Sequence, residues 1–240
     1  MSEIKYSRVL LKISGEALGG KAGFGLETET LDYIAQEIAA VHNLGVQVCV
    51  VVGGGNFIRG SAFSVKGGID RTVADHMGMM GTVMNGLALQ SAIENAGVPT
   101  RVQSAITISE VAEPFIRRRA VRHMEKGRVV VFAAGTGNPY FTTDTAAVLR
   151  ALETDCEVLM KATKVDGIYN KDPKKHDDAV KYDHLTFDQA ISEKLGVMDQ
   201  TAFTMCQENK LSVVVLDMGK PGGMSRVVKG EIEGTLVTSD

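Results

Sequence analysis

The stretch VQVCVVVGGGN, residues 46–56, joins an apolar run directly to three glycines and an asparagine. Such a run, rich in β-branched residues, predicts a strand that is covered on both faces of a sheet. The stretches RVLLKISG at residues 8–15 and VVVFAAGTGN at residues 129–138 repeat the arrangement. Ligands of parallel α/β sheets bind beyond the carboxyl ends of the strands, where bare backbone N–H groups can meet phosphate. Three such turns on one edge therefore indicate a large anionic ligand.

Outward from these turns, short apolar runs alternate with longer amphipathic stretches. The predicted strands cover residues 8–13, 46–52, 101–104, 129–133, 158–161, 213–216 and 235–237. The predicted helices cover residues 28–43, 71–96, 112–125, 145–153, 187–194 and 201–209. This alternation indicates βαβ units, so we expect an α/β fold with a mostly parallel central sheet sandwiched by helices in three layers. The polar segment at residues 166–182 predicts a hairpin or loop.

The composition narrows the class of protein. The 240 residues are 44% hydrophobic and 23% charged, which suffices for one large domain. No linker divides the chain, and if it forms two lobes, we expect 1–150 as one and 151–240 as the other. A net charge of −3 disfavours nucleic acid and anionic membranes as partners. No signal peptide or membrane-spanning run is visible, so we expect a cytoplasmic protein that binds small molecules.

The sequence does not match two common nucleotide-binding patterns. The stretch GEALGGKA at residues 15–22 has the spacing of a P-loop, but Ala22 stands where a hydroxyl would hold Mg²⁺. The turn at residues 53–58 has Ile58 where a dinucleotide fold needs a small residue. The three cysteines and five histidines show no metal-ligand spacing. The sequence thus disfavours a P-loop enzyme, a nicotinamide dehydrogenase and a zinc site.

Two lysines end apolar strands at the predicted ligand edge. Lys12 follows Val9, Leu10 and Leu11, and Lys161 closes a second apolar run in the same way. An unpaired ammonium at a buried strand end is unfavourable, although a lysine can also extend its ammonium to solvent. Two lysines converging on one edge predict a clamp for a polyphosphate, since phosphoryl transfer is catalysed mainly by positioning and charge.

Six motifs in order carry a family resemblance. They are LLKISGEAL, VVVGGGNFIRG, DHMGMMGTVMNGLAL, GTGNPYFTTDTAA, KATKVDGIYNKDP and VMDQTAF. Over essentially its whole length the chain resembles the bacterial uridylate kinases of the amino acid kinase superfamily. The resemblance implies the amino acid kinase fold and reversible transfer of the γ-phosphoryl group of ATP to UMP, with Mg²⁺ carried as Mg-ATP, in pyrimidine nucleotide biosynthesis. The motif GTGNPYFTTD points away from relatives that phosphorylate acetylglutamate, aspartate or carbamate.

The resemblance also implies site residues. The catalytic set is Lys12, Lys161, Arg59 and Asp144, and no protein side chain is assigned to the metal. The ATP-binding positions are Lys12, Ile13, Ser14, Gly15, Gly55, Arg59, Thr163, Tyr169 and Asp172. The UMP-binding positions are Gly54, Asp75, Thr136, Gly137, Asn138, Pro139, Tyr140, Phe141, Thr142 and Thr143. Asp75 can accept hydrogen bonds from ribose hydroxyls, and Arg59 can donate two hydrogen bonds to one phosphate. Asp144 and Asp199 either support the site residues from behind or have a structural role only.

Regulation and assembly follow from the same resemblance. An allosteric GTP site is implied at Gly20, Lys21, Ala22, Gly23, Phe24, Gly25 and Arg101. GTP as an activator, UTP as an inhibitor and a homohexamer built from dimers are implied as well. The helix predicted at residues 71–96 is rich in methionine and glycine, so we expect the dimer contact there.

Two alternatives to a UMP kinase stay open at this point. A phosphotransferase of the same fold can act on a carboxylate or carbamate, and a nucleotide sensor can keep the fold without turnover. The arginine cluster at residues 117–119 is interpreted as a solvated helix face rather than a nucleic-acid site, and His76 as packing or polar support.

Overall fold

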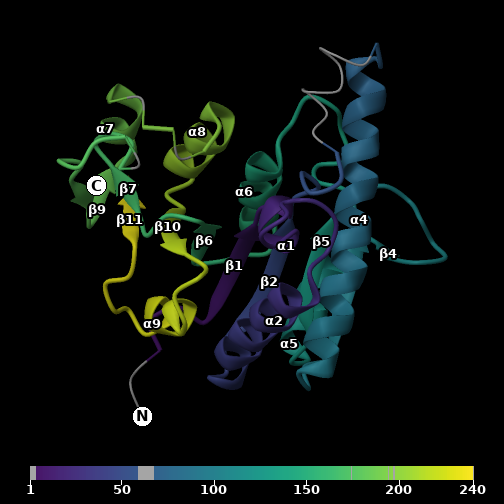
Figure 1. Ribbon diagram of the computed structural model, residues 1–240. Helices are drawn as coiled ribbons and strands as arrows, with labels where there is room; N and C mark the ends of the chain where they lie inside the picture. Colours follow the sequence, from purple (N-terminus) through teal and green to yellow (C-terminus); the bar gives the residue numbers. More distant parts are fainter. Residues whose placement is uncertain (1–3, 59–67, 174, 194, 197, 240) are drawn as a thin grey trace.

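A nine-stranded sheet runs through the part of the chain that the structure describes, residues 4–58, 68–173, 175–193, 195–196 and 198–239 of a computed structural model. The strand order is β4-β3-β5-β2-β1-β6-β10-β11-β9 (Figure 1). The strands of this sheet are β1 (Arg8–Ile13), β2 (Gln47–Val52), β3 (Thr100–Ser104), β4 (Glu113–Pro114), β5 (Val129–Ala133), β6 (Val158–Thr163), β9 (His184–Thr186), β10 (Ser212–Asp217) and β11 (Thr235–Thr238). Neighbouring strands pair in parallel except β10 and β11, so the predicted sheet type is confirmed.

Helices cover both faces of this sheet. They are α1 (Gly15–Leu18), α2 (Thr28–Asn43), α4 (Arg71–Asn95), α5 (Arg117–Glu125), α6 (Thr143–Glu153), α7 (Phe187–Ser192), α8 (Gln200–Glu208) and α9 (Gly223–Val228). Side chains of α2, α4 and α9 join one buried cluster, and side chains of α5, α6, α7 and α8 join the other. The three predicted layers are therefore present.

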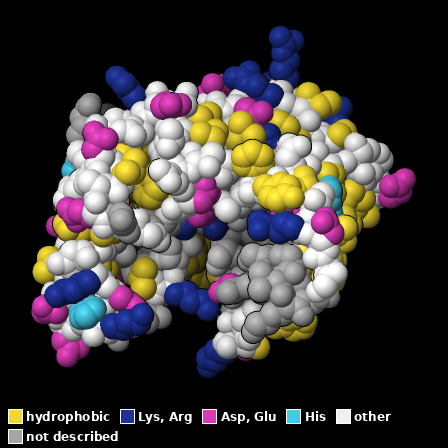
Figure 2. All heavy atoms as spheres, turned by 90° about the horizontal axis from the view of Figure 1, so that it is seen from above, with side chains coloured by type: hydrophobic (Ala, Val, Ile, Leu, Met, Phe, Trp, Pro, Cys, Tyr) yellow, Lys and Arg dark blue, Asp and Glu magenta, His cyan; other side chains and the backbone are white. Residues whose placement is uncertain are grey.

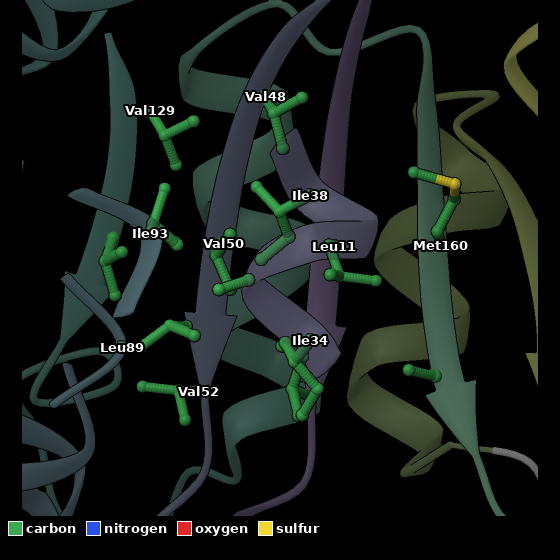
Figure 3. Close-up of a cluster of buried hydrophobic side chains, with 14 of the residues drawn as sticks. Leu11, Ile34, Ile38, Val48, Val50, Val52, Leu89, Ile93, Val129 and Met160 are labelled. Atoms are coloured by element: carbon green, nitrogen blue, oxygen red, sulfur yellow. The ribbon is translucent and has the colours of Figure 1, made fainter. Parts of the chain in front are cut away.

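Alternation along each strand divides the core into these two clusters. Leu11 of β1 points to the α2 side with Val50 of β2 and Met160 of β6, and Ile38 of α2 packs over them (Figure 3). Leu10, one residue earlier, faces the opposite cluster. Lys12 follows the same alternation, so it leaves β1 on the face that α6 covers.

The C-terminal half of the chain forms one side of the sheet. Strands β1 to β5 lie together, and β6, β10, β11 and β9 continue the sheet from β1 outward. Strands β7 (Ile168–Tyr169) and β8 (Lys181–Tyr182) form a separate antiparallel pair, which confirms the hairpin predicted within residues 166–182. Among the described residues, no helix combines the length and apolar character needed to cross a membrane.

One predicted helix was wrong over its first five residues. The helix expected at residues 112–125 begins only at Arg117. Pro114 has no backbone N–H and disfavours helical angles at Glu113 before it. These two residues instead pair with β3 as the short strand β4. Helices α1 and α9 were not predicted, and each is at most six residues long.

Candidate functional site

The carboxyl ends of the parallel strands meet at one edge of the sheet, where the glycine turns lie. Lys12 on β1 and Lys161 on β6 are partners in the register of these two strands. Register partners on adjacent parallel strands point to the same face, so the two ammonium groups lie side by side. Figure 2 looks down on this edge of the molecule and shows a hollow near its centre, bordered by Lys and Arg side chains. The predicted convergence of the two lysines is confirmed.

Asp144 lies between the two ammonium groups. Its Oδ1 is 2.8 Å from Nζ of Lys12, and its Oδ2 accepts a hydrogen bond from Nζ of Lys161 at 2.6 Å. The three side chains are all largely buried, with exposed fractions of 9%, 14% and 13% for Lys12, Asp144 and Lys161. We call them the Lys–Asp–Lys triad. Neither lysine extends to solvent, which removes that alternative.

Burial and charge act against each other in the triad. Burial alone would raise the pKa of Asp144, but the ammonium groups of Lys12 and Lys161 hold it below its ordinary value. Burial lowers the pKa of Lys161, and the attraction of Asp144 only partly offsets this effect. With both lysines protonated, two ammonium groups and one carboxylate leave one net positive charge. A buried net positive charge favours an anionic ligand.

The first turn of α6 places Asp144 and is itself held by Asp199. The side chain of Thr142 caps α6 by accepting from the N–H groups of Asp144 and Thr145. Asp199 caps α8 and accepts from the hydroxyls of Thr142 and Thr145. Its carboxylate thus links the starts of two helices, and its charge also favours the protonated form of Lys161.

The turns after β1 and β2 pack against each other so closely that only glycine fits. A Cβ atom at Gly15 would lie 2.6 Å from the backbone N of Gly55 and 2.8 Å from the carbonyl O of Gly53. A Cβ atom at Gly54 would lie 2.4 Å from the carbonyl O of Gly78 in α4. The missing side chains let the two turns and α4 approach backbone to backbone at this edge of the sheet.

Two other predicted ATP-binding residues use their side chains elsewhere. The Ser14 hydroxyl caps α1 by accepting from the N–H of Ala17, and the side chain of Ile13 is buried in the core. Any contact of Ile13 with a nucleotide must therefore come from its backbone. Arg59, predicted to bind phosphate, lies outside the described residues.

A cavity opens between the 53–55 turn, α4 and the loop after β5. It is lined by Gly54, Gly55, Ile58, Ala74, Asp75, Gly78, Met79, Thr82, Gly135, Thr136, Asn138, Phe141 and Thr143. Six predicted UMP positions are in this set: Gly54, Asp75, Thr136, Asn138, Phe141 and Thr143. We call this space the acceptor cavity.

The other predicted UMP positions lie beside the acceptor cavity rather than on its wall. Gly137 packs against Ala105, and the ring of Tyr140 is mostly exposed. The backbone N–H of Tyr140 donates to Asp75 at 2.8 Å, and Arg71 donates to the same carboxylate at 2.9 Å. Asp75 therefore anchors the 136–143 loop to α4, and its remaining lone pairs can accept from a ligand.

Sequence reasoning missed the wall that α4 contributes. Ala74, Gly78, Met79 and Thr82 line the cavity, yet their helical spacing is that of core residues. The hydroxyl of Thr82 accepts from the N–H of Ala134 at 2.6 Å and holds that residue at a φ of 62°. The signal in the sequence was polarity, since Thr82 and Asn85 are polar residues on the buried face of the helix.

A second cavity lies beyond β6. It is lined by Thr163, Val165, Gly167, Ile168, Tyr169, Asn170, Lys171, Asp172, Pro173, Glu193, Leu195, Gly196 and Val215. The structure thus brings together Thr163, Tyr169 and Asp172, the three residues predicted around adenosine. We call this space the donor cavity. The triad is close in sequence to residues of both cavities: Thr143 of the acceptor cavity precedes Asp144, and Thr163 of the donor cavity follows Lys161 by two residues.

The positions predicted for a GTP site are not adjacent in one chain. The 20–25 segment follows α1 at the glycine-turn edge, and the exposed ring of Phe24 contacts Phe57 edge to face. Arg101 lies near the start of β3 and pairs with Glu94, at the far end of α4 from Asp75. These positions therefore stay a prediction.

The chain is similar to known proteins over nearly its full length. The amino acid kinase family matches residues 7–217. A uridylate kinase of Paramagnetospirillum magneticum is 55% identical over 239 residues, covering 100% of this chain and 99% of that protein. A uridylate kinase of Roseobacter denitrificans is 57% identical over 226 residues, covering 94% and 93% of the two chains.

Solved structures agree with these relatives. The UMP kinase of Bacillus anthracis superimposes with a TM-score of 0.94 at 38% identity, covering 98% of this chain and 97% of that chain. The uridylate kinase of Archaeoglobus fulgidus gives a TM-score of 0.74 at 31% identity, with coverage of 95% and 99%. Both the sequence match and the shared fold extend through the triad and both cavities. The chain belongs to the amino acid kinase family and, within it, to the uridylate kinases.

Proposed function

We propose that the protein catalyses the reversible transfer of the γ-phosphoryl group of ATP to UMP, giving ADP and UDP, as a cytoplasmic enzyme of pyrimidine nucleotide synthesis. One observation carries the proposal: a buried triad with a net positive charge lies at the carboxyl edge of the sheet, and its members are close in sequence to Thr143 and Thr163, which line two separate cavities. UMP is assigned to the acceptor cavity and ATP to the donor cavity. The transferred group then passes over Lys12 and Lys161.

Charge and position account for the reaction without a protein base. The second pKa of a phosphate monoester is about 6, so most UMP is already a dianionic nucleophile at neutral pH. The barrier arises from bringing two anions into line. Lys12, Lys161 and the backbone N–H groups of the glycine turns reduce this repulsion and stabilise the charge that spreads over the transferred group. Asp144 holds both ammonium groups at the place where the phosphates arrive.

The residues at the site fit a magnesium ion that enters with the nucleotide. Mg²⁺ commonly keeps several waters and binds substrate phosphates together with one or two carboxylates. Among the described residues, no group of three or more His, Cys, Asp and Glu side chains is placed to hold a metal. Both oxygens of Asp144 face lysines. When bound to ATP, Mg²⁺ would neutralise charge on the phosphate oxygens.

The order of the strands supports two lobes that bind different substrates. Strands β1 to β5 come from residues before 150, and β6 to β11 come from residues after it. The acceptor cavity is lined by the first group of residues alone and the donor cavity by the second alone. We assign residues 1–150 as the UMP lobe and residues 151–240 as the ATP lobe, which holds the adenosine end of ATP while its phosphates reach the glycine turns of the first lobe.

A panel of acceptors tests the function. The pure protein is incubated with Mg-ATP and, separately, with UMP, CMP, AMP, N-acetylglutamate, aspartate or carbamate, and the ADP formed is counted. Rapid ADP formation with UMP alone supports the proposal. ADP formation with a carboxylate or carbamate instead of UMP would indicate a phosphotransferase of the same fold with that acceptor. Tight nucleotide binding without ADP formation would favour a nucleotide sensor.

A homohexamer built from dimers is the proposed assembly, with GTP and UTP as its proposed activator and inhibitor. Val73, Met80 and Met84 form an exposed apolar stripe along α4, spaced by seven and four residues. A stripe of this kind on a long helix suits a subunit contact. Sedimentation at micromolar protein should show a hexamer. A fully active monomer would contradict the proposed assembly.

A further inference from the structure

Two asparagines face each other in the core behind the glycine turns. Asn56 follows the 53–55 turn and Asn85 lies on α4, and their exposed fractions are 1% and 0%. The Nδ2 of Asn56 donates to Oδ1 of Asn85 at 2.9 Å, and the Nδ2 of Asn85 donates to Oδ1 of Asn56 at 2.7 Å. The two side-chain amides therefore form a cyclic pair.

The second N–H of each amide binds a backbone carbonyl. Asn56 donates to the carbonyl O of Gly25 at 2.6 Å, and Asn85 donates to the carbonyl O of Gly53 at 2.7 Å. A carbonyl oxygen can only accept, so these two contacts also determine which atom of each amide is the nitrogen. All four N–H donors of the pair are used. A fully satisfied buried polar network of this kind fixes one arrangement of the segments that it joins.

The pair joins three segments at the phosphate edge. The backbone N–H of Gly25 donates to the carbonyl O of Asn56 at 3.0 Å, which ties in the loop after α1. The N–H of Gly53 donates to the carbonyl O of Ile13 at 2.9 Å. A Cβ atom at Gly15 would lie 2.6 Å from Oδ1 of Asn56, so the first glycine turn rests on the pair. Neither asparagine is part of the acceptor cavity wall.

We propose that Asn56 and Asn85 are positioning residues for phosphoryl transfer. The pair holds the 53–55 turn so that the backbone N–H groups of Gly54 and Gly55 face the transferred phosphate, and it acts only through that backbone. The inference rests on the proposed function. A misplacement of 1 Å at a reacting group can lower a rate by about a hundredfold. Apolar replacements would leave the carbonyl groups of Gly25 and Gly53 without partners.

Replacing Asn85 by aspartate tests the pair through pH. An ionised carboxylate at this position cannot donate, so the two bonds that Asn85 donates to the carbonyl O of Gly53 and to Oδ1 of Asn56 are lost. The negative charge then faces both of these oxygens, and only the bond donated by Nδ2 of Asn56 can remain. Burial raises the pKa of such a carboxyl, and its protonated form regains one donor. At pH 8 the kcat of Asn85→Asp should be at least about tenfold below wild type, with a UMP KM within about threefold. The ratio of mutant to wild-type kcat should rise as the pH falls to about 6, where the buried carboxyl takes up its proton.

Two further variants separate positioning from stability. Asn85→Ala removes the same donors without adding a titratable group, so its kcat deficit should not depend on pH. Asn95→Asp makes the same chemical change at an exposed position of the same helix and should match wild type. The folded fraction is measured by circular dichroism, and kcat is expressed per folded molecule. Folded Asn85→Asp and Asn85→Ala proteins with wild-type kcat would overturn the inference, as would a deficit of Asn85→Asp that does not change with pH.

A measurement without substrate distinguishes this inference from the proposed function. In Asn85→Asp, backbone amides at residues 25 and 53–56 should exchange hydrogen faster than in Asn95→Asp. If wild type does not phosphorylate UMP but this difference appears, the function is wrong and the pair still positions the turn. Unchanged exchange in an Asn85→Asp protein would contradict the positioning role whatever the reaction.

Discussion

Replacing Lys12 by alanine is expected to lower kcat for UDP formation by about a hundredfold or more, while the KM for UMP changes far less. The ammonium group lies within the triad, where it stabilises charge that develops only as the phosphoryl group moves. The fold should survive the change. Asp144 keeps its hydrogen bond to Lys161 at 2.6 Å, so no buried carboxylate is left unpaired. Single-turnover and steady-state rates with Mg-ATP and UMP measure the effect.

A matched control for Lys12 is Lys126→Ala. Lys126 is an exposed lysine that follows the last residue of α5, away from the glycine turns. It should retain wild-type kcat, because a solvated charge at that distance is screened. If Lys12→Ala kept kcat within a few-fold of wild type, or lost only UMP affinity, the triad would not be the centre of the reaction.

CMP is expected to be a poorer acceptor than UMP by at least about a hundredfold in kcat/KM, on the order of 3 kcal/mol at the transition state. Uracil offers O4 as an acceptor and N3–H as a donor, and cytosine inverts both groups. A cavity whose polar groups are matched to uracil would leave them unpaired against cytosine. Thr136 and Asn138 bring such groups to the wall of the acceptor cavity.

A comparison with dUMP shows which part of the acceptor is recognised. The base is unchanged in dUMP, so any loss reports on the ribose and on contacts such as those available at Asp75. The loss with CMP should exceed the loss with dUMP if the base carries the selectivity. Similar kcat/KM values for UMP and CMP would indicate a broader pyrimidine kinase.

Residues near the ends of strands could be predicted well from the sequence. Lys12 and Lys161 each close an apolar run, and parallel strands bring such ends to one edge by geometry alone. Their partner Asp144 was proposed from family resemblance, but its contact with both lysines could not be foreseen. That contact depends on where α6 begins. The helix begins at Thr143, two residues before the predicted start, because Thr142 caps it.

Contacts between segments that are distant in the chain could not be predicted from the sequence. Asn56 and Asn85 are 29 positions apart, and no sequence pattern around either residue predicts that their side chains are in contact. The wall that Ala74, Gly78 and Thr82 provide was hidden for a similar reason, since helical periodicity does not distinguish a core face from a ligand face. The first five residues of the helix expected at residues 112–125 are not helical, because pairing with β3 and the presence of Pro114 outweighed the local helical pattern.

The pH dependence of kcat/KM tests most directly whether charge alone drives transfer to UMP. The acidic limb should follow the second ionisation of UMP. It cannot come from Asp144, whose pKa is held below the ordinary value of about 3.9 by Lys12 and Lys161 against the effect of burial. The lowered pKa of Lys161 can only affect the alkaline side, where deprotonation would remove a needed charge. With a UMP analogue whose second phosphate pKa is lower, the acidic limb should move to lower pH by the same amount. An acidic limb that stays in place would require a protein base and would contradict the account.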